Sequence, residues 1–537
     1  MRPFLKWLQQ LEAILNRCDS ESVRIQCDVL KKLSALPWSD ADTLIRYHEM
    51  LMFLAAHPHD HQVLKLAEKE FVRIRQYFFE QRKKSNPKYN DCGLPYTTMI
   101  TRFSHELLMW LETRQKGACR MSLDSFESDG VELNTLLRFT LPALERDETT
   151  AGLSNIDLLD ALHISPKNRL TFLLSQFAQL DALPLIKDYL FESLKLFVAI
   201  DLTQASFSRS YNRLPIKAHF FHEDILKRFD HQRLMDDALP EPLPLKDVDR
   251  AEVMDVIRKS LMLTMRETDP SSFTDLESLR LYELERGIQI AIYGLKPNRQ
   301  LALCSYVGYT LFKNGFPAAY GGAWVMGKSA RFGLNIFECF RGGESGYMMC
   351  QLLRVYRQVF QLDAIEIEPY QFGRDNPDGI KSGAFWFYYR YGFRPADAGL
   401  QKLAIEEMKK ITARKSYRSS EKTLIRFTDS EMVLRWNKNK PVRMVDVTEK
   451  VSQMIHRMYR GDRAWAVEDA VKDFRSKTGL PTPLNAAQQE VLIDVALIAK
   501  AYRFTEEEKI FLLSEMVSVK PVDLYAYQRL LSDLFKR

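Results

Sequence analysis

The sequence predicts an α+β protein in which a central mixed sheet lies between two mainly helical regions. Apolar residues recur with the spacing of amphipathic helices up to about residue 230 and again after about residue 397. Between these regions, several segments alternate apolar and polar residues or are rich in strand-forming residues. The 537 residues exceed the size of one ordinary core, so we expect two or three domains. The predicted divisions are a helical region at 1–235, a proline-rich linker at 236–248, a sheet domain at 249–395 and a mainly helical region at 396–537.

Two apolar stripes and a cluster of prolines define the first region and its end. Apolar residues spaced three or four apart share one face of a helix. Closely spaced prolines exclude helix and keep the chain extended, so Pro240, Pro242 and Pro244 mark a boundary. The two stripes are Phe4, Leu8, Leu11 and Leu15, and then Leu64, Phe71, Ile74 and Phe78.

The central domain is predicted to begin with a helix at 250–265 and to continue as a strand meander. Ile288, Ile290 and Ile292 alternate with other residues, and 301–312 is rich in strand formers. Lys313, Asn314 and Gly315 predict a tight turn. The later elements expected are strands at 317–326 and 330–340, a helix from about 348, a strand at 364–368, a helix ending at residue 392, and one extended interruption at 423–436 in the last helical region.

Charge and composition argue against a nucleic-acid partner. The 76 basic residues are nearly matched by 70 acidic ones, which leaves a formal charge of +6. Two basic runs, at 82–88 and 409–418, lie beside predicted helix ends, where cations are favoured by the helix dipole. We therefore interpret them as solvated surface.

The cysteines and the N-terminus predict a cytoplasmic protein. The seven cysteines form no C-x-x-C pair, which is typical of a reducing compartment. The first residues carry a charge within their apolar part and precede no small-residue cleavage site, so we expect no signal peptide. No apolar stretch reaches the length of a membrane span. His57, His59 and His61 are separated by single residues that include Pro58; this spacing favours a hydrated turn, and we expect no metal site.

A glycine-rich loop before a predicted helix is the most informative local feature. The residues are Arg341, Gly342, Gly343, Glu344, Ser345 and Gly346. Glycines let backbone N–H groups approach a phosphate closely, and the N-terminus of the helix adds its positive dipole end. The loop therefore indicates an anion cradle.

This segment resembles the GNAT superfamily of acyl-CoA N-acyltransferases, whose pyrophosphate loop reads Q/R-x-x-G-x-G/A at the start of the helix after the fourth strand. In one register Arg341 takes the Q/R position and Gly346 the final small position, but Glu344 stands where the family has glycine. In the other register Gly343 and Ser345 take the two small positions, and residue 340, a phenylalanine, takes the Q/R position. Both registers remain open.

Two further features carry the resemblance across roughly 249–395. Asn376 precedes a helix that closes in Tyr388, Tyr389, Arg390, Tyr391, Gly392 and Phe393, similar to the family's Y-x-x-x-G-F ending after an Asn. The spacer between Asn376 and Tyr388 is longer than the family's. The strand at 365–368 lies where the family's fifth strand splays from the fourth to admit the pantetheine arm.

The resemblance implies direct acyl transfer from acetyl-CoA or another acyl-CoA to an amine, without a covalent enzyme intermediate. It implies Tyr388 as the acid for the leaving thiolate and backbone N–H groups of the fourth strand as donors to the thioester carbonyl. Packing within the aromatic patch at 385–389 is the alternative role of Tyr388. Candidate bases are Glu338, expected late on the strand before the loop, and Glu366 and Glu368, expected on one face of the next strand. The implied CoA-binding residues are Arg341, Gly342, Gly343, Ser345, Gly346 and Asn376.

Two other functions remain open. The first is a non-catalytic binding or scaffold protein with a degenerate GNAT fold, in which Glu344 repels the pyrophosphate. The second is a transferase that takes an aminoacyl group from tRNA. The amine acceptor, the acyl chain length and the oligomeric state are left open by the sequence.

Overall fold

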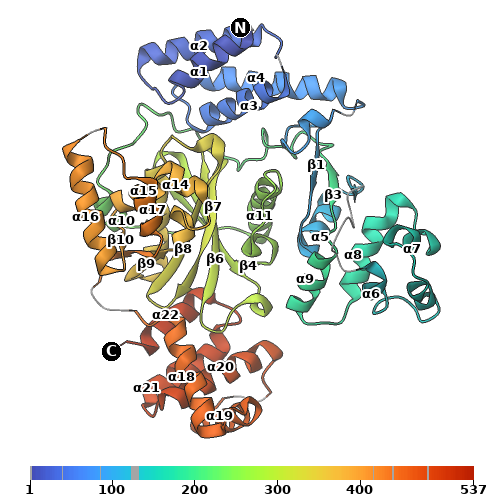
Figure 1. The fold of residues 1–537 in the computed structure, drawn as a ribbon, viewed down its shortest axis with the longest axis vertical. Coiled ribbons are helices and arrows are strands. Elements are labelled where there is room, and N and C mark those ends of the chain that lie inside the picture. The colour runs from blue at the N-terminus through green and yellow to red at the C-terminus, as the bar shows by residue number, and fades with distance from the viewer. Residues whose placement is uncertain are drawn as a thin grey trace.

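A computed structural model describes residues 3–38, 40–84, 86–122, 132–414, 416–437, 441–480 and 483–536 (Figure 1). Residues 85 and 415, within the two basic runs, lie outside this part. The predicted α+β class is confirmed, with N-terminal helices, a central eight-stranded mixed sheet and a C-terminal helical region. In the described ranges no helix has the length and apolar character needed to cross a membrane.

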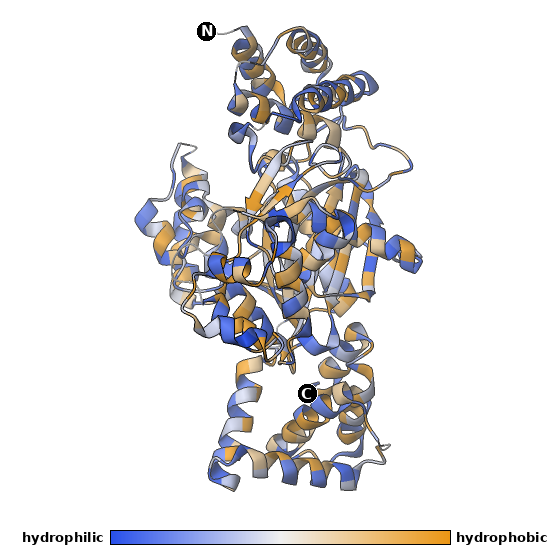
Figure 2. Cartoon of the chain, turned by 90° about the vertical axis from the view of Figure 1, so that its right-hand side faces the viewer, coloured by the Kyte–Doolittle hydropathy of each residue, from blue (hydrophilic) through white to orange (hydrophobic). Residues whose placement is uncertain are grey.

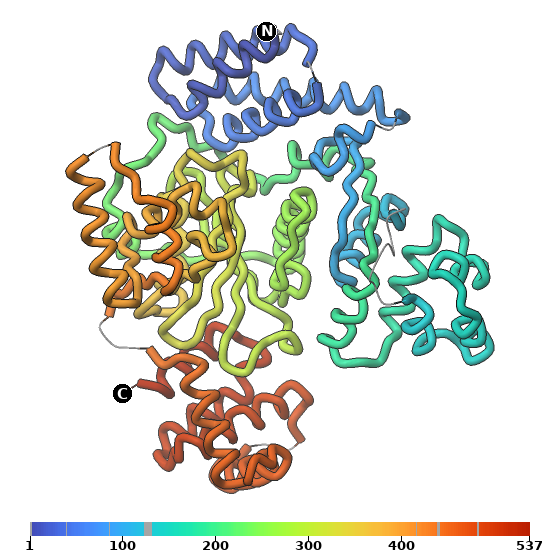
Figure 3. Tube along the Cα trace, in the orientation of Figure 1, coloured from blue at the N-terminus to red at the C-terminus, as the bar shows by residue number. Residues whose placement is uncertain are grey.

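Four helices form a layer over one end of the sheet (Figures 1 and 3). The predicted apolar stripes lie on their inner faces, because Phe4, Leu8 and Leu11 of the first helix and Phe71 and Ile74 of the fourth are buried. An aspartate at the N-cap of the second, third and fourth helices accepts a backbone N–H of the first turn. The helices are α1 (Pro3–Ile14), α2 (Ser20–Ser34), α3 (Ala41–Ala56) and α4 (His61–Gln81).

A second unit with its own apolar core follows the four helices and lies beside the central sheet (Figure 3). It contains a three-stranded antiparallel sheet of order β1-β3-β2, which the prediction of a mainly helical first region did not include. The strands have three or four residues, too few to show a period of two. Its elements are β1 (Thr98–Thr101), α5 (His105–Arg114), β2 (Cys119–Met121), α6 (Leu133–Leu137), α7 (Asn155–Ala161), α8 (Arg169–Gln179), α9 (Pro184–Ser193) and β3 (Val198–Asp201).

The proline-rich linker runs in extended conformation along the edge of the central sheet. The backbone N–H of Leu243 donates to the carbonyl of Leu281 on the edge strand at 2.8 Å. The linker thus packs against the sheet domain that it introduces. It is flanked by α10 (His231–Asp236) and α11 (Asp247–Met262), and α12 (Asp269–Ser272) follows.

The central sheet has the order β10-β11-β9-β8-β7-β6-β5-β4. All neighbours are antiparallel except β8 and β9, which are parallel. The sheet extends past the predicted domain boundary at 395, because β11 inserts between β9 and β10. The strands are β4 (Thr274–Leu284), β5 (Ile288–Leu295), β6 (Ser305–Lys313), β7 (Phe316–Met326), β8 (Ser329–Ile336), β9 (Ala364–Ile367), β10 (Arg394–Pro395) and β11 (Met432–Arg435).

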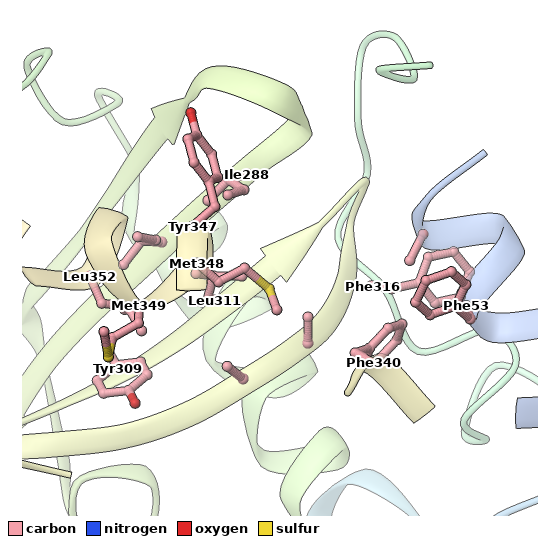
Figure 4. Packing of buried hydrophobic residues seen from close by; sticks show 14 of the residues in the cluster. Phe53, Ile288, Tyr309, Leu311, Phe316, Phe340, Tyr347, Met348, Met349 and Leu352 are labelled. Atoms are coloured by element: carbon pink, nitrogen blue, oxygen red, sulfur yellow. The ribbon is translucent and has the colours of Figure 1, made fainter. Parts of the chain in front are cut away.

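Helices cover both faces of the sheet. Successive residues of β5 point to opposite faces, so they pack against different helices. Ile288, Ile290 and Ile292 share a core with α13 (Ser345–Phe360), whereas Ala291 and Tyr293 pack with α11. Figure 4 shows side chains of α13 packed over β6, and Phe340 beside Phe53 of α3. The core around α13 therefore continues into the N-terminal helices.

The helices from residue 444 onward lie beneath the sheet, whereas the two C-terminal helices before them lie beside β9 and β10 (Figure 1). Hydrophobic and hydrophilic positions alternate along these helices (Figure 2). The last helix contacts the meander directly: Tyr525 donates through its hydroxyl to the Ser278 carbonyl at 2.7 Å, and Gln528 accepts the N–H of Gly327 at 2.7 Å. The helices are α16 (Ala398–Ala413), α17 (Glu421–Phe427), α18 (Met444–Tyr459), α19 (Arg463–Lys477), α20 (Ala486–Tyr502), α21 (Glu507–Val519) and α22 (Leu524–Leu534).

Candidate active site

The two parallel strands separate after a short paired segment. β8 and β9 pair only from Ser329 to Arg331 and from Ala364 to Glu366. Beyond this point β8 continues to Ile336 with β7 on its other side, so its outer edge has no strand partner among the described residues. The backbone of β8 therefore offers a free N–H to whatever lies in the opening.

One carbonyl oxygen occupies this opening. A short turn, η7 (Pro369–Phe372), follows β9 and carries Gln371. The Gln371 Oε1 atom accepts the backbone N–H of Leu334 on β8 at 3.2 Å and the hydroxyl of Tyr388 at 3.4 Å. Two donors from different elements thus converge on one amide oxygen.

Tyr388 lies on α15 (Ala384–Arg390) and is 3% exposed. Its ring packs edge-to-face against Phe387 and Phe393, so it belongs to the predicted aromatic patch. Its hydroxyl nevertheless points to Gln371 in the opening. Burial raises the pKa of Tyr388 well above its ordinary value, so the hydroxyl keeps its proton and acts as a donor.

The candidate bases lie in three different environments. Glu338 was expected late on the strand, but β8 ends at Ile336 and Glu338 lies in the turn η6 (Glu338–Phe340) with a side chain 77% exposed. Glu368 lies just beyond β9, where it caps η7 and forms a surface ion pair with Arg331 at 3.1 Å. Glu366 is on β9, partly buried, and burial raises its pKa. In the described structure no carboxylate is hydrogen-bonded to the Tyr388 hydroxyl.

The glycine-rich loop directly precedes α13, as predicted. Arg341 and Gly342 are exposed, and Gly342 has a φ of 81°, which favours glycine. Ser345 is partly buried and begins the helix. The backbone N–H groups of residues 343–347 donate to no other described residue. The helix start therefore has unpaired donors, as an anion cradle requires.

Packing covers most of this cradle. A Cβ atom on Gly343 would lie 3.1 Å from Phe53 and 3.4 Å from His57, both on or next to α3. A Cβ atom on Gly346 would lie 1.7 Å from the Tyr391 hydroxyl oxygen. Close packing by these rings explains why both positions are glycine. Only the Arg341 end of the loop faces solvent.

Glu344 is fully buried in a charge network that the sequence did not reveal. Its carboxylate accepts from Lys313 Nζ at 2.5 Å, from Arg286 at 2.6 Å and from the Leu226 N–H at 3.0 Å. The His222 Nε2 atom lies 3.7 Å away. These partners hold the pKa of Glu344 well below its usual range despite burial. The carboxylate is thus neutralised from the side of the sheet.

The histidine segment differs from the predicted hydrated turn. His57 is fully buried at the C-terminus of α3, and its Nε2 atom has no hydrogen-bond partner among the described residues. Its ring stacks on Phe53 with centroids 4.5 Å apart. His61 begins α4. The described residues contain no group of three or more histidine, cysteine or acidic side chains placed to hold a metal ion.

Asn376 has a structural role at the start of α14 (Pro377–Ser382). Its Oδ1 atom accepts the Gly379 N–H at 3.3 Å, and its Nδ2 atom donates to the Tyr370 carbonyl at 2.9 Å. The chain then breaks at Gly383, with a φ of 67°, before α15 begins. This break between two helices accounts for the long spacer from Asn376 to Tyr388.

Comparison with known proteins identified no relative. No family model matches the chain, and no similar curated protein or solved structure was found.

Proposed function

We propose that the chain is an acyl-CoA-dependent N-acyltransferase that passes an acetyl or longer acyl group directly to an amine. One observation carries the proposal. The Leu334 N–H and the Tyr388 hydroxyl converge on a single carbonyl oxygen where β8 and β9 separate. Acyl transfer requires such donors at the carbonyl that becomes an oxyanion.

In the proposed acyl transfer, Leu334, Tyr388 and Glu366 each take part in the reaction. The unprotonated amine attacks the thioester carbonyl carbon, and the carbonyl oxygen takes up negative charge. The N–H of Leu334 and the hydroxyl of Tyr388 both donate to this oxyanion. When the C–S bond breaks, Tyr388 transfers its proton to the leaving thiolate. The acylated nitrogen still carries the surplus proton from the attack and passes it to the tyrosinate as the neutral amide forms. Glu366, whose pKa burial raises, is the candidate base that removes the proton of an ammonium substrate before the attack and so leaves the amine neutral.

The residues around the loop fit the CoA moiety at the solvent-facing end. Arg341 and Gly342 are accessible to a phosphate, and the unpaired N–H groups at the start of α13 supply further donors. The neutralised Glu344 carboxylate does not oppose an anion here. The proposal concerns the acyl donor and applies to any primary or secondary amine as the acceptor.

A thermal-shift experiment with acetyl-CoA, longer acyl-CoAs and free CoA tests the proposal. A donor present at 100 times its dissociation constant stabilises the chain by about 2.7 kcal/mol. We expect a rise in melting temperature with at least one acyl-CoA. Absence of a shift with every one of these ligands at millimolar concentration would contradict the proposal.

The packing over Gly343 and Gly346 favours a second candidate, a scaffold protein that has kept the fold without binding CoA. The same thermal-shift experiment distinguishes the acyltransferase from the scaffold, because a scaffold that does not bind CoA gives no rise in melting temperature. The aminoacyl-tRNA alternative gains no such support. In the basic runs, Lys410 is paired with Glu407 at 2.8 Å, and Arg82 donates to a backbone carbonyl of its own helix.

A further inference from the structure

The Gln371 side chain has the chemistry of the group that an acyltransferase must hold. A carboxamide is planar and carries a carbonyl oxygen beside a nitrogen, as does the amide product of N-acylation. Its Oε1 atom takes up both donors that the proposed mechanism assigns to the acyl carbonyl, Leu334 at 3.2 Å and Tyr388 at 3.4 Å. An acyl carbonyl bound to these donors cannot share them with Gln371.

The attachment of this side chain is weak, whereas its backbone is fixed. Both hydrogen bonds lie at or beyond the long end of the normal range. The Nε2 atom donates to no other described residue, and the residue is partly exposed. By contrast, the Gln371 N–H donates to the Glu368 carbonyl at 3.0 Å, and the adjacent Phe372 is buried against Phe385. Rotation of the side chain alone therefore frees the two donors, while η7 stays in place.

We infer that Gln371 is a gate, whose carboxamide occupies the acyl-carbonyl position in the free protein and swings out when the donor thioester binds. This inference rests on the proposed acyltransferase function. The gate shields the unpaired edge of β8 from water and makes the donor compete for the Leu334 N–H. Displacing the Gln371 carboxamide therefore weakens the binding of the acyl-CoA donor.

Donor binding by the full-length chain tests the gate. The variants are Gln371→Ala, Gln371→Met as a substitution of similar length without the acceptor oxygen, and Gln401→Ala as a control on the exposed face of α16. Calorimetry with the acyl-CoA that gives the largest thermal shift measures the dissociation constant of each. We expect Gln371→Ala to bind about 3- to 10-fold more tightly than the parent, the size of one net hydrogen bond, and Gln401→Ala to match the parent. Gln371→Met gives the same comparison if the alanine variant does not fold.

Hydrogen exchange supplies a second readout at the proposed point of contact. In Gln371→Ala without donor, the amide of Leu334 loses its acceptor and exchanges faster, and saturation with donor restores its protection. The results separate the two hypotheses. If neither the parent nor Gln371→Ala binds any acyl-CoA, the proposed function fails and the gate with it. If both bind with equal affinity, or the variant binds more weakly, or donor leaves the amide unprotected, the function stands and the gate is wrong.

Discussion

Replacing Lys313 by methionine should destabilise the region around α13 by about 3 to 5 kcal/mol. Lys313 is fully buried, and its ammonium donates to Glu344 at 2.5 Å and to the Arg286 carbonyl at 2.7 Å. Methionine keeps the chain length but leaves the buried carboxylate with one cationic partner in contact, Arg286. Removal of one partner from a buried ion pair costs about 3 to 5 kcal/mol, because the remaining charge stays desolvated.

Hydrogen exchange of α13 and β6 measures this loss as a local free energy of opening, which suits a chain with several separate hydrophobic cores. The matched control is Lys410→Met. The Lys410–Glu407 pair has a 2.8 Å contact, but the lysine is 57% exposed and screened by solvent, so its loss should cost far less stability than the loss of Lys313. Adding Glu344→Gln to the Lys313 variant should recover part of the loss, because the unpaired charge is removed. A Lys313→Met effect no larger than that of the control would refute the reasoning.

Two further predictions concern the site and the network. Tyr388→Phe should slow acyl transfer by about 100-fold while leaving donor affinity nearly unchanged, and the neighbouring Tyr389→Phe should change the rate much less; equal rates for Tyr388→Phe and the parent would reduce Tyr388 to packing. Burial lowers the pKa of His222 to about 4 from an ordinary value of 6.5. The unfolded chain therefore binds more protons in this interval, and the free energy of unfolding falls by up to about 3 kcal/mol as the pH drops from about 6.5 to about 4. His222→Gln should flatten this dependence in melting temperatures recorded from pH 7.5 to 4.5, and an equally steep loss in the variant would assign it to other groups.

The periodic part of the fold could be predicted from the sequence. The helical stripes, the meander and the segment from β8 to β9 each follow a local repeat of residue types, and the structure contains all of them. Features that depend on pairing across long distances could not be predicted. The short strand β11 pairs with β9, which lies much earlier in the chain. The strands β1, β2 and β3 are too short to show an alternation of apolar and polar residues.

Some residues of the candidate site could also be proposed from the sequence, and others could not. Tyr388 could be proposed from the sequence because it is the first residue of a Y-x-x-x-G-F ending, and the loop could be proposed because it is rich in glycine. Gln371 has no such signal beyond being a polar residue shortly after a strand. Two partners of Glu344 are Arg286, in the turn before β5, and Lys313, at the end of β6, and only the antiparallel pairing of these strands brings them together. From the sequence alone we therefore interpreted Glu344 as a departure from the GNAT loop pattern, and as a charge that repels the pyrophosphate only in the scaffold alternative.

The insertion of β11 between β9 and β10 has a consequence for biosynthesis. The chain leaves the ribosome from its N-terminus, so β9 and β10 are made before the strand that joins them. Until β11 emerges, β9 has an open edge, and such edges invite pairing with other chains. α22, which covers the meander through Tyr525 and Gln528, is made later still. Ribosomes stalled between residues 395 and 432 should therefore display the protein in its most aggregation-prone form.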